Sequence, residues 1–142
     1  TAPRMTEFSF PIRVYYEDTD SGGVVYYANY LKFMERARTE YLRGLGFEQD
    51  EIIANEGVIF AVRSVKLDFL KPARFNQLLN VSAQLAEVGK ASLLFAQRVE
   101  LAQHEPSHIF CAGHVKIACL DARTLRPTAI PPRILREVTS ER

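Results

Sequence analysis

The sequence has few of the features that mark membrane proteins or nucleic-acid-binding proteins. Its 142 residues contain no apolar run near the roughly 18 to 20 residues needed to cross a bilayer, and no basic segment followed by an apolar stretch begins the chain. The 18 basic and 17 acidic residues nearly cancel, so the overall charge favours neither a nucleic acid nor an anionic membrane as a partner. These absences predict a cytoplasmic protein with no nucleic-acid partner and no stable membrane insertion.

Cysteine is also scarce, because only Cys111 and Cys119 are present. Both fall in one predicted strand, which would separate them by roughly 26 Å, whereas a disulfide tolerates Cα separations up to about 7 Å. We therefore expect two free thiols, as is usual in a reducing compartment. Repeats, low-complexity tracts and linkers are absent as well. With 47% hydrophobic and 25% charged residues, the sequence predicts one globular domain over residues 1–142.

Apolar residues recur every three to four positions over residues 26–45, which predicts a helix of about five turns. Gly44 and Gly46 follow as residues that commonly end a helix. A shorter helix is predicted over residues 50–55, capped by Asp50 and ended at Gly57. Another short helix is expected after Pro132.

The remaining segments alternate between apolar and polar residues and are predicted to be strands. They cover residues 9–16, 58–69, 79–89, 91–101 and 109–120. The apolar set changes parity near Arg63 and Ser64, which predicts a bulge or sharp bend there. Because no helix separates the last four strands, their connections are short and the sheet should be antiparallel. The predicted class is α+β, with about five antiparallel strands wrapped around one long central helix.

Two acids and two glycines separate the first strand from the long helix, in the order Asp18, Asp20, Gly22 and Gly23. A carboxylate just before a helix start lies beside unpaired main-chain N–H groups and the positive end of the helix dipole. Glycines allow a carbonyl group to approach closely. This arrangement indicates an active site. Each acid also has a plainer interpretation as a turn or cap residue, which we favour for Asp18 but not for Asp20.

Metal sites are not predicted from this pattern. A calcium loop starting at Asp18 would need an oxygen ligand at its fifth position and Glu at its twelfth, where the sequence has Gly22 and Asn29. The three histidines have no cysteine or acid at a matching helical spacing, so a zinc site is not expected either. The histidines are His104, His108 and His114.

Residues 14–38, VYYEDTDSGGVVYYANYLKFMERAR, resemble the signature of the hotdog-fold acyl-CoA thioesterases of the 4-hydroxybenzoyl-CoA thioesterase family. They are most similar to its Tol-Pal-associated, YbgC-type branch. The resemblance extends over nearly the whole chain and includes residues 60–63, 71–74, 89–92 and 125–127. It implies a hotdog fold and a hydrolase that converts an acyl-CoA thioester into a free acid and coenzyme A. Coenzyme A is then part of the substrate, and no other cofactor is expected.

The resemblance also implies roles for individual residues. Asp20 would be the catalytic carboxylate, acting as general base or as nucleophile. The main-chain N–H of Tyr27, at the helix start, would polarise the thioester carbonyl, with Gly23 in the same turn. The branch commonly has His where Tyr27 stands. A position that supplies only its N–H group tolerates Tyr, whereas one that needs an imidazole does not, and we favour the first interpretation.

The same resemblance suggests residues that bind the acyl group or the phosphates of coenzyme A. Each also has a plainer interpretation as a packing or surface residue. The candidates are Val25, Asn29, Tyr30, Glu35, Arg63, Lys71, Arg74, Lys90 and Ser92.

By the pattern of the family, the chain should form a homodimer or a homotetramer built as a dimer of dimers, with active sites between subunits. Acyl carrier protein is a further candidate partner. The main alternative is a binding module that holds an acyl-CoA or acyl carrier protein without hydrolysis. The intact Asp20 favours catalysis, because a buried carboxylate adds nothing to the binding of a neutral thioester. A hydratase or dehydratase would need a His paired with an acid, and none is expected near the motif because no His precedes His104.

Overall fold

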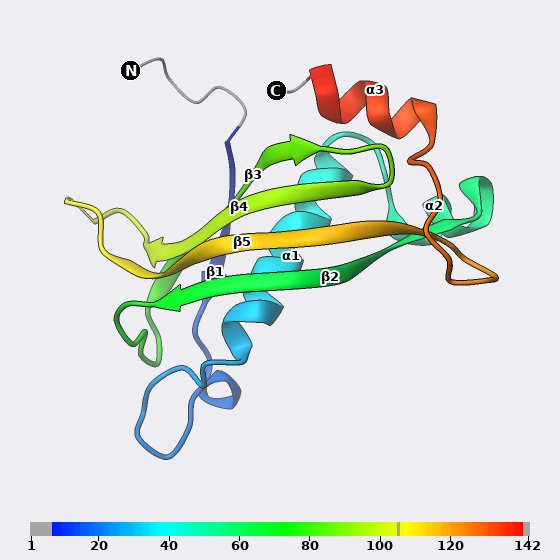
Figure 1. Ribbon diagram of the computed structural model, residues 1–142. Coiled ribbons are helices and arrows are strands. Elements are labelled where there is room, and N and C mark those ends of the chain that lie inside the picture. The colour runs from blue at the N-terminus through cyan, green and yellow to red at the C-terminus, as the bar shows by residue number, and fades with distance from the viewer. Residues whose placement is uncertain (1–6, 105, 141–142) are drawn as a thin grey trace.

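Five strands form one antiparallel sheet in the computed structural model, which describes residues 7–104 and 106–140 (Figure 1). The order across the sheet is β1-β3-β4-β5-β2, so β1 and β2 are its two edges. This arrangement confirms the predicted antiparallel sheet. Of the predicted domain, residues 1–6, 105 and 141–142 lie outside the described residues. The strands are β1 (Phe8–Arg13), β2 (Val58–Phe69), β3 (Leu78–Val88), β4 (Ser92–Leu101) and β5 (Ile109–Asp121).

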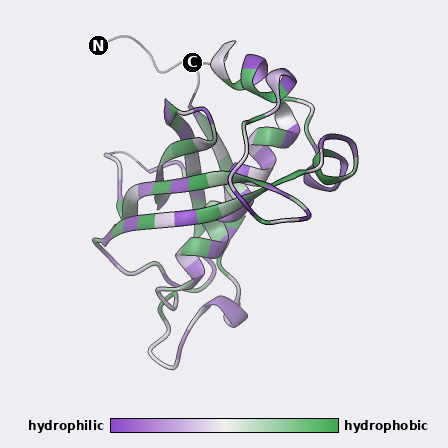
Figure 2. Cartoon of the chain, turned by 45° about the vertical axis from the view of Figure 1, so that its right-hand side comes forward, coloured by the Kyte–Doolittle hydropathy of each residue, from purple (hydrophilic) through white to green (hydrophobic). Residues whose placement is uncertain are grey.

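Helix α1 (Asn29–Gly44) crosses one face of the sheet, as Figure 1 shows. Its side chains Phe33, Met34 and Leu42 are almost completely buried against inward-facing residues such as Val81 and Phe95. Full burial of one such side chain contributes about 1.5–3 kcal/mol. Figure 2 shows the matching pattern along the strands, where hydrophobic and hydrophilic residues alternate. These buried positions follow the three-to-four-residue period from which the long helix was predicted.

The sheet has two distinct ends, which follow from the strand register. At the turn end, β1 ends at Arg13, β2 ends at Phe69, and β4 connects to β5 through residues 102–108. At the hairpin end, β3 connects to β4 through residues 89–91. Helix α1 begins at the turn end, because the 14–28 segment links it to β1.

The predicted change of register in β2 is confirmed, because its pairing with β5 shifts between Val62 and Ser64. Beyond this bulge, Leu67 lies opposite Gly113. A Cβ atom on Gly113 would lie 2.0 Å from the main-chain oxygen of Lys66, so only glycine lets the two strands approach this closely. The bulge and the glycine together keep β2 paired with β5 along almost its whole length.

Most element boundaries lie within one residue of the prediction, but the end of β1, the start of α1 and the cap of α2 differ from it. Strand β1 ends at Arg13 rather than at residue 16, because residues 16–18 form a 3-10 turn. Helix α1 starts at Asn29 rather than Tyr26, because the N–H of Tyr26 donates to the main-chain oxygen of Asp18 instead. The predicted Asp50 cap is wrong, since α2 (Gln49–Glu56) begins after Glu48 and no side chain caps it.

The end of the chain forms α3 (Pro132–Ser140), which confirms the helix expected after Pro132. Its residues Ile134 and Val138 are fully buried, so it covers part of the core. Cys111 and Cys119 are both free and buried, as predicted. Burial raises the pKa of each thiol to about 11. None of the helices in residues 7–104 and 106–140 is long and apolar enough to span a membrane.

Candidate active site

Asp20 lies at the start of a three-residue hairpin loop. Its N–H donates to the main-chain oxygen of Val24 at 2.9 Å, and its own oxygen accepts the N–H of Gly23 at 3.0 Å. Gly23 has a φ of +80°, the left-handed value that this type of loop requires at its last position. The hairpin therefore fixes the backbone of Asp20 and explains Gly23 without assigning it a contact with a ligand.

The carboxylate of Asp20 is only half used within the described residues. Oδ1 accepts the N–H of Gly22 at 2.9 Å, and no hydrogen bond engages Oδ2. The side chain is exposed in the single chain. One oxygen thus orients the carboxylate, and the other is available to accept a proton or attack a carbonyl carbon.

Asp18 has the structural role that the plainer interpretation gave it. It is buried, and its Oδ2 accepts the N–H of Tyr15 at 2.9 Å. Its main-chain oxygen accepts the N–H of Tyr26 at 3.0 Å and the side-chain amide of Asn29 at 2.8 Å. Asp18 and Asn29 therefore tie the hairpin to the first turn of α1. Asn29, predicted to bind substrate, is buried in this structural role.

The first turn of α1 presents main-chain donors. The N–H groups of Asn29, Tyr30 and Leu31 bond to the oxygens three residues before them. Those of Tyr27 and Ala28 make no hydrogen bond within the described part of the chain. Two unpaired donors at the positive end of a helix can bind the oxygen of a polarised carbonyl. The Tyr27 ring itself is 60% exposed and meets Phe69 edge-on.

A hollow of about 260 Å³ lies directly beside this turn. Tyr30 forms part of its wall, is 3% exposed, and accepts the N–H of Ala73 on its phenolic oxygen at 3.0 Å. Burial raises the pKa of this phenol, so Tyr30 remains a neutral packing residue. The N–H of Val25 donates to the main-chain oxygen of Ala73 at 2.8 Å. The hollow is lined by Val25, Tyr27, Tyr30, Phe69, Leu70, Lys71 and Pro72.

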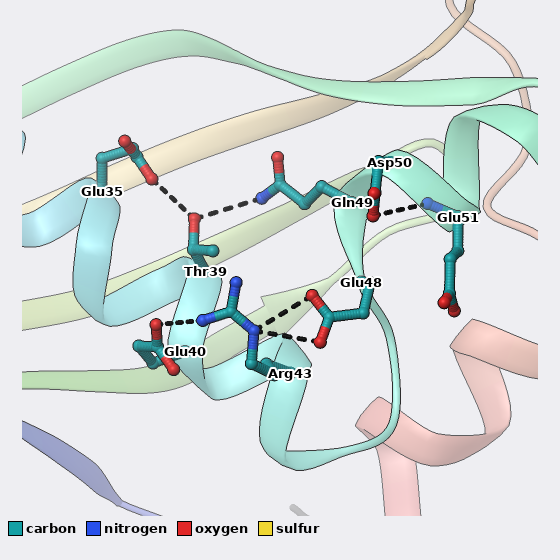
Figure 3. A network of polar contacts seen from close by, with 8 residues as sticks. All are labelled: Glu35, Thr39, Glu40, Arg43, Glu48, Gln49, Asp50 and Glu51. Atoms are coloured by element: carbon teal, nitrogen blue, oxygen red, sulfur yellow. Dashed lines mark hydrogen bonds and ion pairs between the residues drawn. The ribbon is translucent and has the colours of Figure 1, made fainter.

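Glu35 points away from this turn, into a polar network on the surface of α1 and α2 (Figure 3). It accepts the hydroxyl of Thr39 at 2.6 Å, and Thr39 in turn accepts the side-chain amide of Gln49 at 3.3 Å. The same network includes Arg43, which pairs with Glu40 and Glu48. Glu35 also lines a groove of about 190 Å³ between α1 and β2.

The basic candidates are divided between the two ends of the sheet. Lys71 and Arg74 lie in the loop after β2, at the turn end, and Arg74 forms an isolated bridge with Val24. Arg63 lies exposed at the bulge in the middle of β2. Lys90 and Ser92 lie at the hairpin end, the opposite end from Asp20 in the same chain. One chain therefore brings Asp20, Tyr27, Lys71 and Arg74 to the turn end of the sheet. Lys90 and Ser92 of the same chain lie at the other end.

Sequence reasoning missed a buried polar pair between α1 and the sheet. Arg38, 7% exposed, donates to Oε1 of Gln97 at 3.0 Å. The side-chain amide of Gln97 donates to the main-chain oxygens of Met34 and Ser82, both at 3.0 Å. Burial lowers the pKa of Arg38, although nearby Glu35 opposes the shift. The signal was the single polar residue, Gln97, on the apolar face of its strand.

Strand order brings His108 to the turn end of the sheet, although no histidine precedes His104 in the sequence. The β4–β5 connection returns to the turn end, where the charge of Lys71 helps to lower the pKa of His108, after the larger effect of desolvation. His108 packs on Phe110 and His104 rather than on a carboxylate. Within residues 7–104 and 106–140, no cluster of three His, Cys, Asp or Glu side chains is arranged to bind a metal ion.

Known proteins resemble this chain in sequence and in fold. Residues 22–107 match the family model described as the thioesterase superfamily. The acyl-CoA thioesterase YbgC of Haemophilus influenzae is 43% identical over 89% of this chain and 90% of its own. The acyl-CoA thioester hydrolase YbgC of Escherichia coli is 40% identical over 93% and 96%, respectively. A crystal structure of a 4-hydroxybenzoyl-CoA thioesterase variant in complex with 4-hydroxybenzoyl-CoA superposes with a TM-score of 0.86 at 16% identity, covering 94% of this chain and 99% of that one.

Proposed function

The chain belongs to the thioesterase superfamily and has its hotdog fold, and we propose that it is an acyl-CoA thioesterase whose catalytic carboxylate is Asp20. One observation carries the proposal: among the described residues, the Asp20 carboxylate has one oxygen without a hydrogen bond, and the start of α1 that follows it has two N–H groups without one. Relatives named as acyl-CoA thioesterases match nearly the whole chain, which supports the reaction class.

The proposed reaction begins when the thioester carbonyl oxygen binds at the N–H groups of Tyr27 and Ala28. Oδ2 of Asp20 then accepts a proton from a water molecule whose oxygen attacks the carbonyl carbon. Alternatively, Oδ2 attacks that carbon directly and forms a mixed anhydride, which water hydrolyses. In both routes the carbon–sulfur bond breaks and the thiolate of coenzyme A leaves. The thiolate takes up a proton, from protonated Asp20 in the first route and from water in the second, and the acid is released. A thioester has little resonance to overcome, so one carboxylate and one or two donors suffice.

The exposed edge of β2 supports assembly as a homodimer. Val62, Val65 and Phe69 lie on the inward face of the sheet, yet they are 53%, 40% and 51% exposed at its β2 edge. A long unpaired edge with apolar residues is an unstable surface in a monomer. We propose that β2 pairs antiparallel with β2 of a second copy, and that two such dimers form a tetramer.

This pairing also supports a role for the residues that one chain leaves far apart. An antiparallel two-fold contact places the hairpin end of one subunit beside the turn end of the other. Lys90 of the partner subunit and Ser92 of the partner subunit would then lie on the side of Asp20, Lys71 and Arg74. Positive charges from both chains would bind the phosphates of coenzyme A. Acyl carrier protein, whose prosthetic arm ends in the same thiol, is a further candidate partner. The two buried free thiols support a cytoplasmic location.

A panel of short, long and aromatic acyl-CoAs tests the proposed reaction. Purified protein should release free thiol from at least one class, measured with a chromogenic disulfide at neutral pH. The buried thiols of the protein itself add little background. Tight binding of acyl-CoA with no release from any member would instead support a binding module of the same fold.

Subunit mixing tests the shared site. Asp20→Asn and Lys90→Glu chains are refolded together and assayed below the KM of wild type. A mixed dimer contains one site with both wild-type residues, so activity should recover to about a quarter of wild type from two weak parents. If the mixture shows only the average of its parents, Asp20 and Lys90 do not act across the interface.

A further inference from the structure

An aromatic platform projects from the turn end, outside the site described above. The rings of Tyr16 and Phe75 stack in parallel, with centroids 3.8 Å apart and planes 8° apart. Tyr16 is 75% exposed, Phe75 is 40% exposed and the neighbouring Tyr15 is 63% exposed. Large apolar side chains gathered on a surface commonly mark a binding site. Because one face of Tyr16 covers Phe75, its high exposure means that the opposite face is open.

The backbone holds this platform in place. The N–H of Val14 donates to the main-chain oxygen of Gln77, and the N–H of Asn76 donates to that of Val14, both at 2.9 Å. These bonds continue the β1–β3 ladder beyond the ends of the two strands. They bring the segments that carry Tyr16 and Phe75 together, so the stack is built before a ligand arrives. A preformed site loses less entropy when it binds.

A hollow of about 620 Å³ lies at the platform and has a size typical of small-molecule sites. Arg13 lines it and donates one N–H to the main-chain oxygen of Asn76 at 2.8 Å, which orients the guanidinium and leaves its other donors open. Glu17 also lines the hollow and supplies a carboxylate that can accept a hydrogen bond from an amino group. An aromatic face, a cation and an acceptor match a purine nucleotide with an exocyclic amine.

The position of the platform relates it to the proposed reaction. Tyr16 precedes Asp20 by four residues. The loop after β2 takes part in both places: its residues 70–72 line the hollow beside Tyr27, and its Phe75 forms part of the platform. The platform extends the β1 edge of the sheet, whereas the proposed subunit contact uses the β2 edge. A β2-paired dimer therefore leaves the platform open.

We infer that Tyr16 and Phe75 form a stacking site for the adenine ring of the substrate's coenzyme A, with Arg13 beside the ribose 3′-phosphate and Glu17 beside the adenine amino group. This inference rests on the proposed function, because that function supplies the adenine nucleotide. Stacking acts on the part of the substrate that does not react. Stacking that is equally strong in the ground state and in the transition state lowers KM and leaves kcat unchanged.

The test compares two thioesters of the same acyl group, one of coenzyme A and one of pantetheine, which lacks the nucleotide. Tyr16→Ala should raise KM for acyl-CoA by roughly 5- to 100-fold, the loss expected for one base stacked on an aromatic ring, with kcat retained. KM for the pantetheine thioester should stay the same. Tyr16→Phe, which keeps the ring, is the matched control and should behave as wild type. Phe75→Ala should repeat the effect of Tyr16→Ala.

Direct titration with 3′-phosphoadenosine 5′-diphosphate separates this inference from the proposed function. If wild type hydrolyses neither thioester, the proposed function fails. The platform is still established in that case if wild type binds the nucleotide and Tyr16→Ala binds it more weakly. Equal KM changes for both thioesters, or unchanged nucleotide binding in Tyr16→Ala, would overturn the inference. A change of oligomeric state in Tyr16→Ala with unchanged nucleotide binding would overturn it too, and would assign the platform to a subunit contact.

Discussion

Replacement of Gln97 by Leu tests how the fold holds α1 against the sheet. Gln97 is 3% exposed, and its side chain joins Arg38 to the main-chain oxygens of Met34 and Ser82 through three hydrogen bonds. It also fills a gap in the sheet, because the β3–β4 pairing skips from Val81 to Gln84. Leu has a similar volume but no polar atoms, so the substitution removes the hydrogen bonds without opening a large cavity.

The expected loss follows from the three groups left without their partner. A buried polar group without a partner costs about 1–3 kcal/mol, and a charged one costs more. The added apolar burial of Leu returns about 1–2 kcal/mol. We expect Gln97→Leu to lower the free energy of unfolding by about 4 kcal/mol, a large share of the 5–15 kcal/mol typical of a domain. Urea unfolding followed by circular dichroism measures this difference.

Two further variants isolate the cause. Gln84→Leu is the matched control, since the Gln84 side chain lies on the same strand pair and makes no hydrogen bond in the described part of the chain. The free energy of unfolding of this variant should differ from that of wild type by about 0.5 kcal/mol or less. Adding Arg38→Met to Gln97→Leu should recover half or more of the loss, because the charge leaves together with its acceptor. If Gln97→Leu is as stable as Gln84→Leu, the reasoning about this buried bridge is refuted.

Other substitutions probe the turn and the thiols. Gly23→Ala should cost about 1–2 kcal/mol of stability because φ is +80°, whereas Gly23→Asn should cost less; equal losses in thermal melts would contradict the backbone explanation. Tyr27→Ala should keep turnover within about threefold if the position acts through its N–H group, and a 100-fold loss in thiol release would show that the ring is needed. Burial raises the pKa of Cys111 and Cys119 to about 11 in the folded protein, whereas an unfolded thiol has a pKa of about 8.5. The contribution of these thiols to stability is therefore complete below about pH 8.5 and is lost as pH rises towards 11. The urea midpoint should therefore fall between pH 9 and 11 in wild type and fall less in a Cys111→Ala, Cys119→Ala variant.

The elements of the fold were largely predictable because each has a local signal. The period of apolar residues identified α1 and the strands, and the change of parity near Arg63 located the bulge in β2. The start of α1 was placed three residues early, because the pattern could not show that the N–H of Tyr26 pairs with Asp18 across the hairpin. Such pairings depend on two segments meeting in space, and periodicity carries no information about them.

The site was predictable in its centre and less so at its margins. Asp20, Gly23 and Tyr27 lie close in sequence, in the hairpin and the segment that leads from it into α1. Lys90 and Ser92 lie at the opposite end of the sheet, where only a second subunit could bring them to Asp20. The return of His108 to the turn end and the stack of Tyr16 on Phe75 both follow from strand order, which the sequence does not display. The roles of these residues towards a substrate stay predictions.

Thiol release by Asp20→Asn, compared with wild type on the best acyl-CoA of the panel, tests the central claim most directly. The substitution keeps the shape of the side chain, and its amide oxygen can still accept the N–H of Gly22, but the ionised oxygen that acts on water or on the carbonyl carbon is gone. The account predicts that kcat falls by roughly 100-fold or more while acyl-CoA still binds and the urea midpoint stays close to that of wild type. Undiminished kcat in Asp20→Asn would contradict the assignment of Asp20 as the catalytic carboxylate.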